Sequence, residues 1–514
     1  MNATVHVARY NPIDRIDPNV YGHLSEHLGR CVYGGIWVGE GEERVPTEGG
    51  IRLDTAELLH DLDVPVLRWP GGCFADDYHW RDGVGLREER PRRRNMWWTQ
   101  GREDVPEESN AFGTEEFMRL CDMLGAEPYL AVNVGSGDPD EAVDWAEYCN
   151  YDGDTELTRL RGANGSDDPH DVIWWGVGNE NWGCGGRFSP ELYAEQFRRH
   201  ANYLTAFDRV MCDGDIQLVA CGHNTDNWNR RFLDHLAECV SFGQGTVYDL
   251  LDHLSVHRYY HAGGDTDFTE DQYYRLLARA AKVGDDVDRA AEALEMFASG
   301  VDVGIVVDEW GVWHPEAVFE NGLEQANTIR DALAAASVFD DLNQRADVVS
   351  MANIAQTVNV LQCLVQTDEA SAWPTPTYQV FDLYAPHMGA TSLRTVVDAE
   401  TRAVESKGSE FGPEDTHEVT QVSASASETD GHVHVTVSNR ELDATREVTI
   451  SLGAGEPSVT DARVLFAGLP VDTYSTSSNA EAFAPEPIDV TETTDSIVVD
   501  IPPSSVVGVT VEVS

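Results

Sequence analysis

The sequence predicts an α/β protein made of a (β/α)8 TIM barrel and a C-terminal antiparallel β-sandwich of jelly-roll type. From about residue 20 to residue 354, short apolar runs alternate with stretches of helical periodicity, which is typical of βα units around a parallel sheet. After about residue 378, apolar and polar residues alternate instead, which indicates half-buried antiparallel strands. The 514 residues suffice for one large barrel and a smaller domain.

Eight apolar runs are the expected barrel strands, within a barrel of residues 18–377. Two of the helices between them carry end signals. Thr114 opens a helix that stops before Gly125, where a left-handed residue is favoured. Ser189 and Pro190 form the N-cap and first turn of a second helix. The expected strands are residues 20–23, 64–68, 128–133, 172–179, 217–221, 253–257, 304–309 and 349–354.

The last part of the chain, residues 378–514, is expected to form the β-sandwich. Period-two alternation is clear at residues 432–437 and 447–452. This part contains no cysteine and no tryptophan, so we expect it to carry no chemistry of its own. Residues 1–17 form a third segment, whose alternating start is predicted to pair with the sandwich.

Two glutamates stand where buried strands reach solvent. Glu180 follows the run 172–179, and Glu309 ends the run 304–309. Side chains at the carboxyl ends of barrel strands face one common site, so Glu180 and Glu309 should converge. Glycoside hydrolysis requires two such carboxyl groups, and a separation of about 5 to 5.5 Å is typical of the retaining mechanism. The alternative for either residue alone is a solvated loop carboxylate.

Short stretches along the expected barrel match one enzyme family. The stretches are residues 22–30 (GHLSEHLGR), 68–74 (RWPGGCF), 78–83 (YHWRDG), 178–180 (GNE), 308–310 (DEW) and 352–356 (ANIAQ). In these stretches the chain resembles the family 51 α-L-arabinofuranosidases, a branch of the retaining (β/α)8 glycosidases. They span nearly the whole barrel in the family's order, and the C-terminal part resembles the family's β-sandwich.

The resemblance implies a retaining exo-acting enzyme that needs no cofactor and no metal. Its substrates would be terminal non-reducing α-L-arabinofuranosyl residues of arabino-oligosaccharides, arabinan or arabinoxylan fragments. Glu180 would be the general acid/base and Glu309 the nucleophile. Asn179 would hydrogen-bond the sugar 2-OH, a contact that tightens in the transition state. The family's other contacts with the sugar or the nucleophile fall on Glu26, Arg68, Tyr259 and Gln356.

Two positions in the second matching stretch bear on the chemistry. Arg68 has a rationale independent of the resemblance, because a fixed cation beside Glu309 would keep that carboxylate ionised and aimed; a surface salt bridge is the alternative. Cys73 departs from the asparagine of many family members, so an amide that could bind a sugar hydroxyl is missing. We interpret Cys73 as a mark of a subgroup.

Aromatic and histidine residues complete the set of candidates. Trp98, next to Trp97, and Trp313 lie in loops after expected strands and could stack on sugar faces, although ordinary loop packing is the alternative. His257 is expected to orient groups in the pocket by hydrogen bonding. The spacing of His253, His257 and His261 also allows a metal site, which we disfavour because His261 should already lie in a loop.

The predicted fold and the two glutamates are also compatible with other functions. A β-xylosidase or an endoglucanase is the main alternative, since the fold and two carboxylates do not determine the sugar. An inactive sugar-binding barrel is a second alternative, against which the presence of both Glu180 and Glu309 argues.

The charge balance of the chain is extreme. Against 90 acidic residues stand 35 basic ones, a net charge of -55, and only Lys282 and Lys407 are lysines. Such a field repels nucleic acid and anionic lipid, so we expect neither as a partner. Because 41% of the residues are hydrophobic, disorder does not explain the acidity. The composition resembles that of proteins from extreme halophiles.

The nine cysteines lie in apolar surroundings between Cys31 and Cys363. We expect free buried thiols in a reducing compartment rather than a disulfide framework. The first residues show neither an apolar nor a basic targeting region, and no run is long enough to span a membrane. These observations predict a soluble cytoplasmic protein, and the family resemblance implies a homo-oligomer, often a hexamer.

The surface charge generates a first testable prediction. Repulsion between carboxylates should be severe at 0.01 M salt, where the Debye length is roughly 30 Å, and mostly screened at 1 M, where it is about 3 Å. We expect the melting temperature to rise steeply between these limits and to respond alike to NaCl and KCl. Thermal unfolding measured from about 0.05 to 4 M salt checks this. A melting temperature that does not change with salt would refute the halophilic interpretation.

Overall fold

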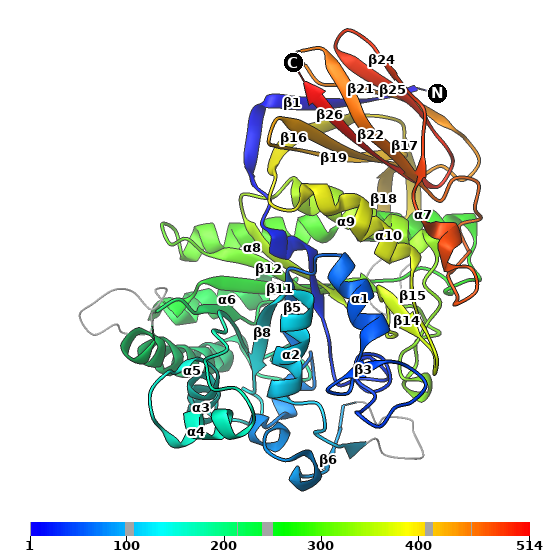
Figure 1. The fold of residues 1–514 in the computed structure, drawn as a ribbon. Coiled ribbons are helices and arrows are strands. Elements are labelled where there is room, and N and C mark those ends of the chain that lie inside the picture. Colours follow the sequence, from blue (N-terminus) through cyan, green and yellow to red (C-terminus); the bar gives the residue numbers. More distant parts are fainter. Residues whose placement is uncertain are drawn as a thin grey trace.

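The computed structural model of the protein describes residues 2–97, 107–212, 214–238, 250–406, 415–453 and 455–513. A barrel of parallel strands surrounded by helices forms one part, and a β-sandwich packs beside it (Figure 1). The predicted fold class is confirmed. Among the described residues, no helix combines the length and apolar character needed to cross a lipid bilayer.

All eight predicted strands are present and form a closed barrel. They are β2 (Gly22–Leu24), β5 (Val66–Trp69), β8 (Glu127–Val132), β9 (Trp174–Val177), β10 (Gln217–Ala220), β11 (His253–Tyr260), β12 (Gly304–Val312) and β13 (Val349–Ala355). The order around the barrel is β10-β11-β12-β13-β2-β5-β8-β9. Every neighbouring pair is parallel, so the carboxyl ends of all eight strands lie at the same end of the barrel.

The helices of the described residues begin and end at the expected signals. Gly125 follows α2 with a φ of 72°, and the Ser189 side chain caps α5 by accepting a hydrogen bond from the backbone N–H of Leu192. The helices are α1 (Leu53–Asp61), α2 (Thr114–Leu124), α3 (Pro139–Asn150), α4 (Glu156–Ala163), α5 (Pro190–Met211), α6 (Asp226–Glu238), α7 (Glu270–Ala280), α8 (Val283–Phe297), α9 (Ile329–Asn343) and α10 (Pro376–Tyr384).

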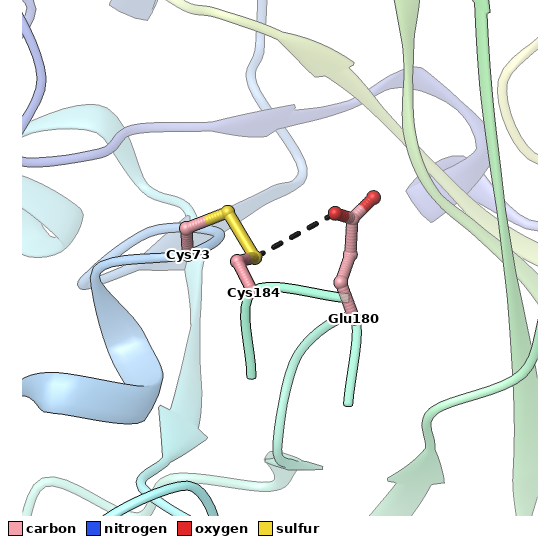
Figure 2. A group of neighbouring side chains, drawn as sticks. All are labelled: Cys73, Glu180 and Cys184. Atoms are coloured by element: carbon pink, nitrogen blue, oxygen red, sulfur yellow. Dashed lines mark hydrogen bonds between the residues drawn. A yellow bond between two sulfur atoms is a disulfide. The ribbon is translucent and has the colours of Figure 1, made fainter. Parts of the chain in front are cut away.

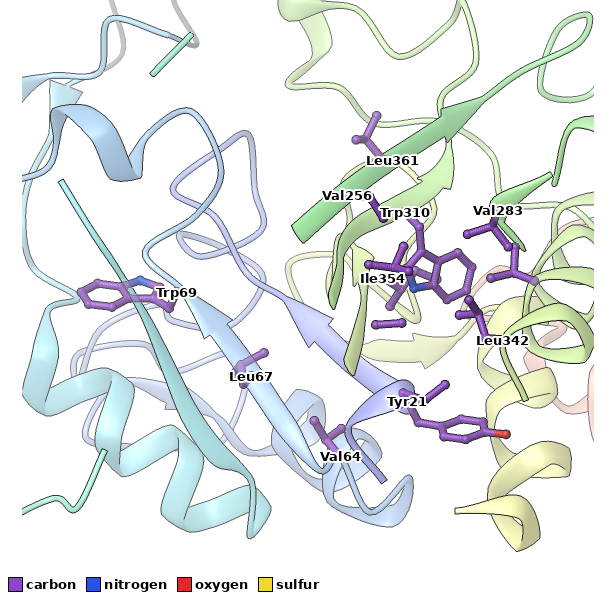
Figure 3. Close-up of a cluster of buried hydrophobic side chains, with 14 of the residues drawn as sticks. Tyr21, Val64, Leu67, Trp69, Val256, Val283, Trp310, Leu342, Ile354 and Leu361 are labelled. Carbon is purple, nitrogen blue, oxygen red and sulfur yellow. The ribbon is translucent and has the colours of Figure 1, made fainter. Parts of the chain in front are cut away.

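Alternation along β5 shows how the core positions the site. Leu67 and Trp69 point toward the surrounding helices (Figure 3). There Trp69 stacks on Phe117 of α2 at a ring distance of 5.1 Å. Burial of a side chain of this size stabilises the fold by about 2 to 3 kcal/mol. Because successive residues face opposite sides, Val66 and Arg68 point into the barrel. The outer apolar residues therefore fix the direction of Arg68.

The sandwich is built from ten strands and includes the start of the chain. They are β1 (Asn2–Arg15), β16 (Thr391–Asp398), β19 (Val422–Thr429), β20 (His432–Asn439), β21 (Arg446–Ser451), β22 (Pro457–Leu465), β23 (Glu486–Pro487), β24 (Val490–Glu492), β25 (Ser496–Ile501) and β26 (Ser505–Val513). The predicted antiparallel sheet is present, and the N-terminal strand β1 joins it by running antiparallel to β16 and parallel to β21.

Helix α9 joins the two parts. It contacts β12 of the barrel as well as β19, β20 and β26 of the sandwich (Figure 1). At its end, the buried Asn343 amide donates to the hydroxyls of Tyr21 (3.1 Å) and Ser425 (3.0 Å). Short two-stranded ribbons complete the fold: β3 (Thr47–Glu48) with β4 (Ile51–Arg52), β6 (Arg93–Arg94) with β7 (Glu107–Glu108), β14 (Val365–Thr367) with β15 (Ala372–Pro374), and β17 (Thr401–Ser406) with β18 (Asp415–Thr420).

Candidate active site

The two glutamates singled out in the sequence meet at the carboxyl end of the barrel. Glu180 lies just after β9, and Glu309 lies in β12. Nδ1 of His257 lies 3.0 Å from Oε1 of Glu180 and 3.5 Å from Oε2 of Glu309. One oxygen of each carboxyl group and this nitrogen all lie within 4.8 Å of one another. The two carboxyl groups therefore face each other across a single imidazole.

Glu309 is surrounded by donors that favour its ionised form. Arg68 Nη1 donates to Oε1 (3.0 Å), and the Tyr259 hydroxyl donates to Oε2 (2.8 Å). Burial alone would raise the pKa of Glu309, but the positive charges of His257 and Arg68 outweigh it and hold the pKa below its usual value. Glu309 is thus a desolvated carboxylate with a fixed orientation.

A bulge in β12 lets two consecutive carboxylates face the barrel interior. His257 of β11 pairs with Glu309, whereas the preceding residue pairs with Val307, so Asp308 is an extra residue in β12. Asp308 accepts hydrogen bonds from Tyr129 (3.1 Å) and from the Asn353 amide (3.1 Å). Without the bulge, strict alternation would turn Glu309 toward the outer helices.

Arg68 links three of the strand ends and has no exposed surface. Besides Glu309, its guanidinium contacts Asp308 Oδ1 (3.4 Å) and donates to Asn179 Oδ1 (2.7 Å). Burial opposes its charge, but the negative charge of Asp308 contributes most to raising the pKa of Arg68 above its usual value. The alternative of a surface salt bridge is therefore wrong.

Asn179 has one polar group left over. Arg68 fixes its Oδ1, and its backbone N–H donates to Asp76 (2.8 Å). Its Nδ2 is buried and has no hydrogen-bond partner among the described residues. A buried amide nitrogen without a partner is rare in folded proteins, so this N–H₂ group is available to a ligand.

Glu26 lies beside the nucleophile candidate and is held by two donors. The Gln356 amide donates to Oε2 (3.0 Å), and the backbone N–H of Phe74 donates to Oε1 (3.1 Å). Burial, together with the charge of Glu309, raises the pKa of Glu26 to about 7. At neutral pH Glu26 can therefore both donate and accept hydrogen bonds, as binding of a sugar hydroxyl requires.

The neighbours of His257 favour its charged form, and His257 does not form a histidine triad. Burial would lower its pKa, but the charges of Glu309 and Glu180 raise it above the usual value. His253 instead lies at the start of β11, within hydrogen-bond distance of Gln217 (3.2 Å) and Ser350 (2.9 Å). Within the described part of the chain, His253, His257 and His261 are not close enough together to hold one metal ion.

Comparison with known proteins identifies the family. A sequence model of the "Alpha-L-arabinofuranosidase 1 domain" matches residues 58–275, and one of the "Alpha-L-arabinofuranosidase C-terminal domain" matches residues 308–505. The chain is 39% identical, over 459 residues, to an "Intracellular exo-alpha-L-arabinofuranosidase" of Bacteroides ovatus, a match that covers 88% of this chain and 84% of the relative. The chain belongs to the family 51 α-L-arabinofuranosidases.

Solved structures agree with this membership. The family 51 arabinofuranosidase of Xanthomonas axonopodis pv. citri superimposes with a TM-score of 0.88 at 33% identity, over 99% of each chain. The α-L-arabinofuranosidase of Thermotoga maritima in its arabinose complex gives 0.86 at 30% identity, over the whole of both chains. The barrel, the sandwich and their connection are therefore those of family 51.

The prediction about the cysteines is wrong at one pair. Cys73 and Cys184 form a disulfide across 111 residues, beside Glu180 (Figure 2). The other described cysteines are free, as expected, and Cys239 lies outside the described residues; the free ones are Cys31, Cys121, Cys149, Cys212, Cys221 and Cys363. Composition missed this bond because nothing in the sequence marks two distant loop cysteines as neighbours.

The predicted aromatic residues have different outcomes. Trp313 is half-buried and packs edge-on against Tyr259 at a ring distance of 5.6 Å, so it borders the residue that holds Glu309. Its indole N–H donates to the carbonyl of Ala317 (3.1 Å). Trp98 lies outside the described residues.

Sequence reasoning did not single out Asp76. This buried carboxylate, in a short 3-10 helix at Ala75–Asp77, accepts from the backbone of Asn179 (2.8 Å) and from the Asn181 amide (3.2 Å). Burial raises its pKa to about 7, although these donors oppose the shift. An aspartate next to a matching motif in so acidic a chain carries no distinguishing signal.

The glycine pair Gly71 and Gly72, before Cys73, allows close approach of the backbone. A Cβ on Gly72 would lie 2.6 Å from Oε1 of Glu309, whereas a Cβ on Gly41 would meet nothing within 4 Å. Neither Gly72 nor Gly41 has a positive φ, so only the available space distinguishes these two glycines.

We expect Gly72→Ala to displace Glu309 and to lower kcat/KM on a nitrophenyl glycoside about a hundredfold. Gly41→Ala is the matched control, and circular dichroism verifies folding. Wild-type activity of a folded Gly72→Ala variant would contradict the predicted displacement.

Proposed function

We propose that the protein is a retaining exo-α-L-arabinofuranosidase with Glu180 as acid/base and Glu309 as nucleophile. The observation that carries the proposal is the short distance between the two carboxyl groups: one oxygen of Glu180 lies within 4.8 Å of one oxygen of Glu309. This spacing agrees with retention, for which carboxyl groups lie about 5 to 5.5 Å apart, and is shorter than the roughly 6.5 to 9.5 Å typical of inverting enzymes.

In the first step, Glu309 attacks the anomeric carbon while Glu180 gives a proton to the leaving oxygen. Glu309 suits this role because Arg68 and Tyr259 hold it ionised and aimed. The proton is kept in the hydrogen-bonded pair of Glu180 and His257, whose Oε1 and Nδ1 are 3.0 Å apart. A covalent glycosyl-enzyme forms and the aglycone departs.

In the second step, Glu180 takes a proton from water, which attacks the same anomeric carbon and releases the sugar and free Glu309. The unpartnered Nδ2 of Asn179 is the donor we assign to the sugar 2-OH. Glu26 and Gln356, hydrogen-bonded to each other, are assigned to further hydroxyls. The residues assigned to the sugar thus lie just after β2, β9 and β13, on both sides of Glu309.

The identity of the sugar rests on the relatives. The name of the Bacteroides ovatus relative supports an exo-acting arabinofuranosidase, and arabino-oligosaccharides, arabinan and arabinoxylan fragments are the substrates that fit. The same relative's name supports an intracellular setting. The net charge of -55 with only two lysines supports work at high salt.

A panel of nitrophenyl glycosides tests the substrate. We expect turnover of the α-L-arabinofuranoside to exceed that of the β-D-xyloside and the β-D-cellobioside by at least about a hundredfold in kcat/KM, since hydroxyl contacts select strongly between sugars. Glu309→Ala serves as the blank for contaminating activity. A preference for the xyloside or the cellobioside would replace the proposal by a β-xylosidase or an endoglucanase.

Removal of the nucleophile tests the role of Glu309. We expect Glu309→Ala to abolish turnover, and added azide or formate to restore part of it, because a small anion fills the space left by the carboxylate. Nuclear magnetic resonance should then show a glycosyl product of inverted configuration. Near-normal activity without added anion would rule out Glu309 as the nucleophile.

Removal of the acid tests the role of Glu180. A proton donor matters most when the leaving group is poor, so Glu180→Ala should lose far more activity on arabino-oligosaccharides than on an aryl arabinofuranoside with an acidic phenol. The difference should be about 10² to 10⁴ in the glycosylation step. Equal losses on both substrates would show that Glu180 is not the donor.

A further inference from the structure

Glu180 lies in one of two loops that a disulfide joins. Cys73 belongs to the loop after β5, and Cys184 to the loop after β9 that contains Glu180. Figure 2 shows the disulfide beside the Glu180 carboxyl group. Cys184 Sγ lies 3.6 Å from Oε2 of Glu180. One sulfur of the disulfide therefore contacts the carboxyl group that we assign as acid/base.

The backbone of Glu180 needs such support. Its φ is 42°, in the left-handed region that disfavours residues other than glycine. Its carbonyl accepts from the backbone N–H groups of Gly183 (2.6 Å) and Gly185 (3.1 Å), so the chain turns back at Cys184. The disulfide anchors this turn to the loop after β5 and thereby holds Glu180 in its turn conformation.

The two oxygens of Glu180 have unlike neighbours. Oε1 faces the His257 imidazole at 3.0 Å, and Oε2 faces the disulfide sulfur. A disulfide sulfur carries no proton, so it covers Oε2 without donating a hydrogen bond to it. Oε2 is then free of competing donors and can serve the leaving oxygen. A thiol at the same place could donate to Oε2 and could also move away.

We propose that the Cys73–Cys184 disulfide is a positioning element for Glu180, and that its reduction by a dithiol impairs acid/base catalysis. The inference rests on the proposed role of Glu180. The activity of the enzyme then depends on the redox state of the solution, while the residues assigned to sugar binding, Glu26, Asn179 and Gln356, stay in place.

The reduction is chemically accessible. Both cysteines are half-buried rather than sealed, so a small dithiol can reach them. One thiolate of dithiothreitol attacks a sulfur of the bond, and the other cysteine leaves as a thiolate that takes up a proton. The second thiol of the reductant then attacks the mixed disulfide and displaces the remaining protein cysteine as a thiolate, which also takes up a proton. The protein gains two electrons and two protons as two thiols, and the reductant becomes a cyclic disulfide.

The experiment compares oxidised enzyme, dithiothreitol-treated enzyme and the double variant Cys73→Ser with Cys184→Ser. For each, kcat and KM are measured on aryl α-L-arabinofuranosides with leaving groups from acidic to weakly acidic phenols. Titration with a thiol reagent under denaturing conditions verifies that treatment adds two thiols. Cys121→Ser, at a buried free thiol on α2, is the matched control.

We expect reduction and the double variant each to lower kcat/KM about ten- to a hundredfold on the poorest leaving group, as a misplaced catalytic group does. The loss should be several-fold smaller on the best leaving group, where proton donation matters least. KM for that substrate should not rise, because the hydroxyl-binding residues are unchanged. The double variant should no longer respond to the dithiol, whereas Cys121→Ser should respond like the wild type.

Other outcomes are decisive. If reduced and oxidised enzyme show the same dependence on the leaving group, the hydrogen bonds of Asp76 to the same loop suffice and the positioning role is wrong. A uniform loss on all substrates with a lowered melting temperature would show a purely structural bond. If Glu180→Ala itself lacks the dependence on the leaving group, it is the proposed function that fails. A loss of activity on reduction, without a dependence on the leaving group in Glu180→Ala, therefore does not support the positioning role.

Discussion

The site depends on one buried cation, the guanidinium of Arg68. A charge without contact to water is tolerated only when anions and acceptors surround it. Asp308, Glu309 and Asn179 meet this demand from β12 and from the loop after β9. Arg68 therefore ties together the strand ends that carry both catalytic candidates, and the outward packing of Trp69 fixes its direction. Loss of the guanidinium would leave neighbouring carboxylates unpaired in a dry interior.

The number of acids in the site exceeds the number of cations. Four carboxyl groups, those of Glu26, Glu180, Asp308 and Glu309, lie around Arg68 and His257, and burial in such a cluster disfavours additional negative charge. The raised pKa of Glu26 and the lowered pKa of Glu309 show how the site resolves this conflict. The carboxyl group of Glu26, with its pKa near neutrality, can carry a proton, while the neighbouring Glu309 favours its ionised form, as the proposed nucleophile requires. The same geometry thus gives two glutamates different chemistry.

Much of this arrangement could be predicted from the sequence, because strand ends leave a local pattern. The runs before Glu180 and Glu309 indicated buried strands, and barrel geometry then required the two residues to meet. The Asp308 bulge, the Cys73–Cys184 bond and the Asp76 hydrogen bonds could not be predicted in this way. Each is a relation between segments distant in the chain, and neither residue type nor spacing records which loops come together.

The strand β1 has a consequence for how the chain reaches its fold. Residues 2–15 pair with β16 and β21, so β1 has no partner until synthesis has reached residue 391. The barrel also closes late, since β2 meets β13 only after residue 355 has been synthesised. Pairings of such sequence separation form slowly, and an unpaired strand edge invites association with other chains. The late pairing of β1 therefore leaves the growing chain open to association with other chains until residue 391 has been made.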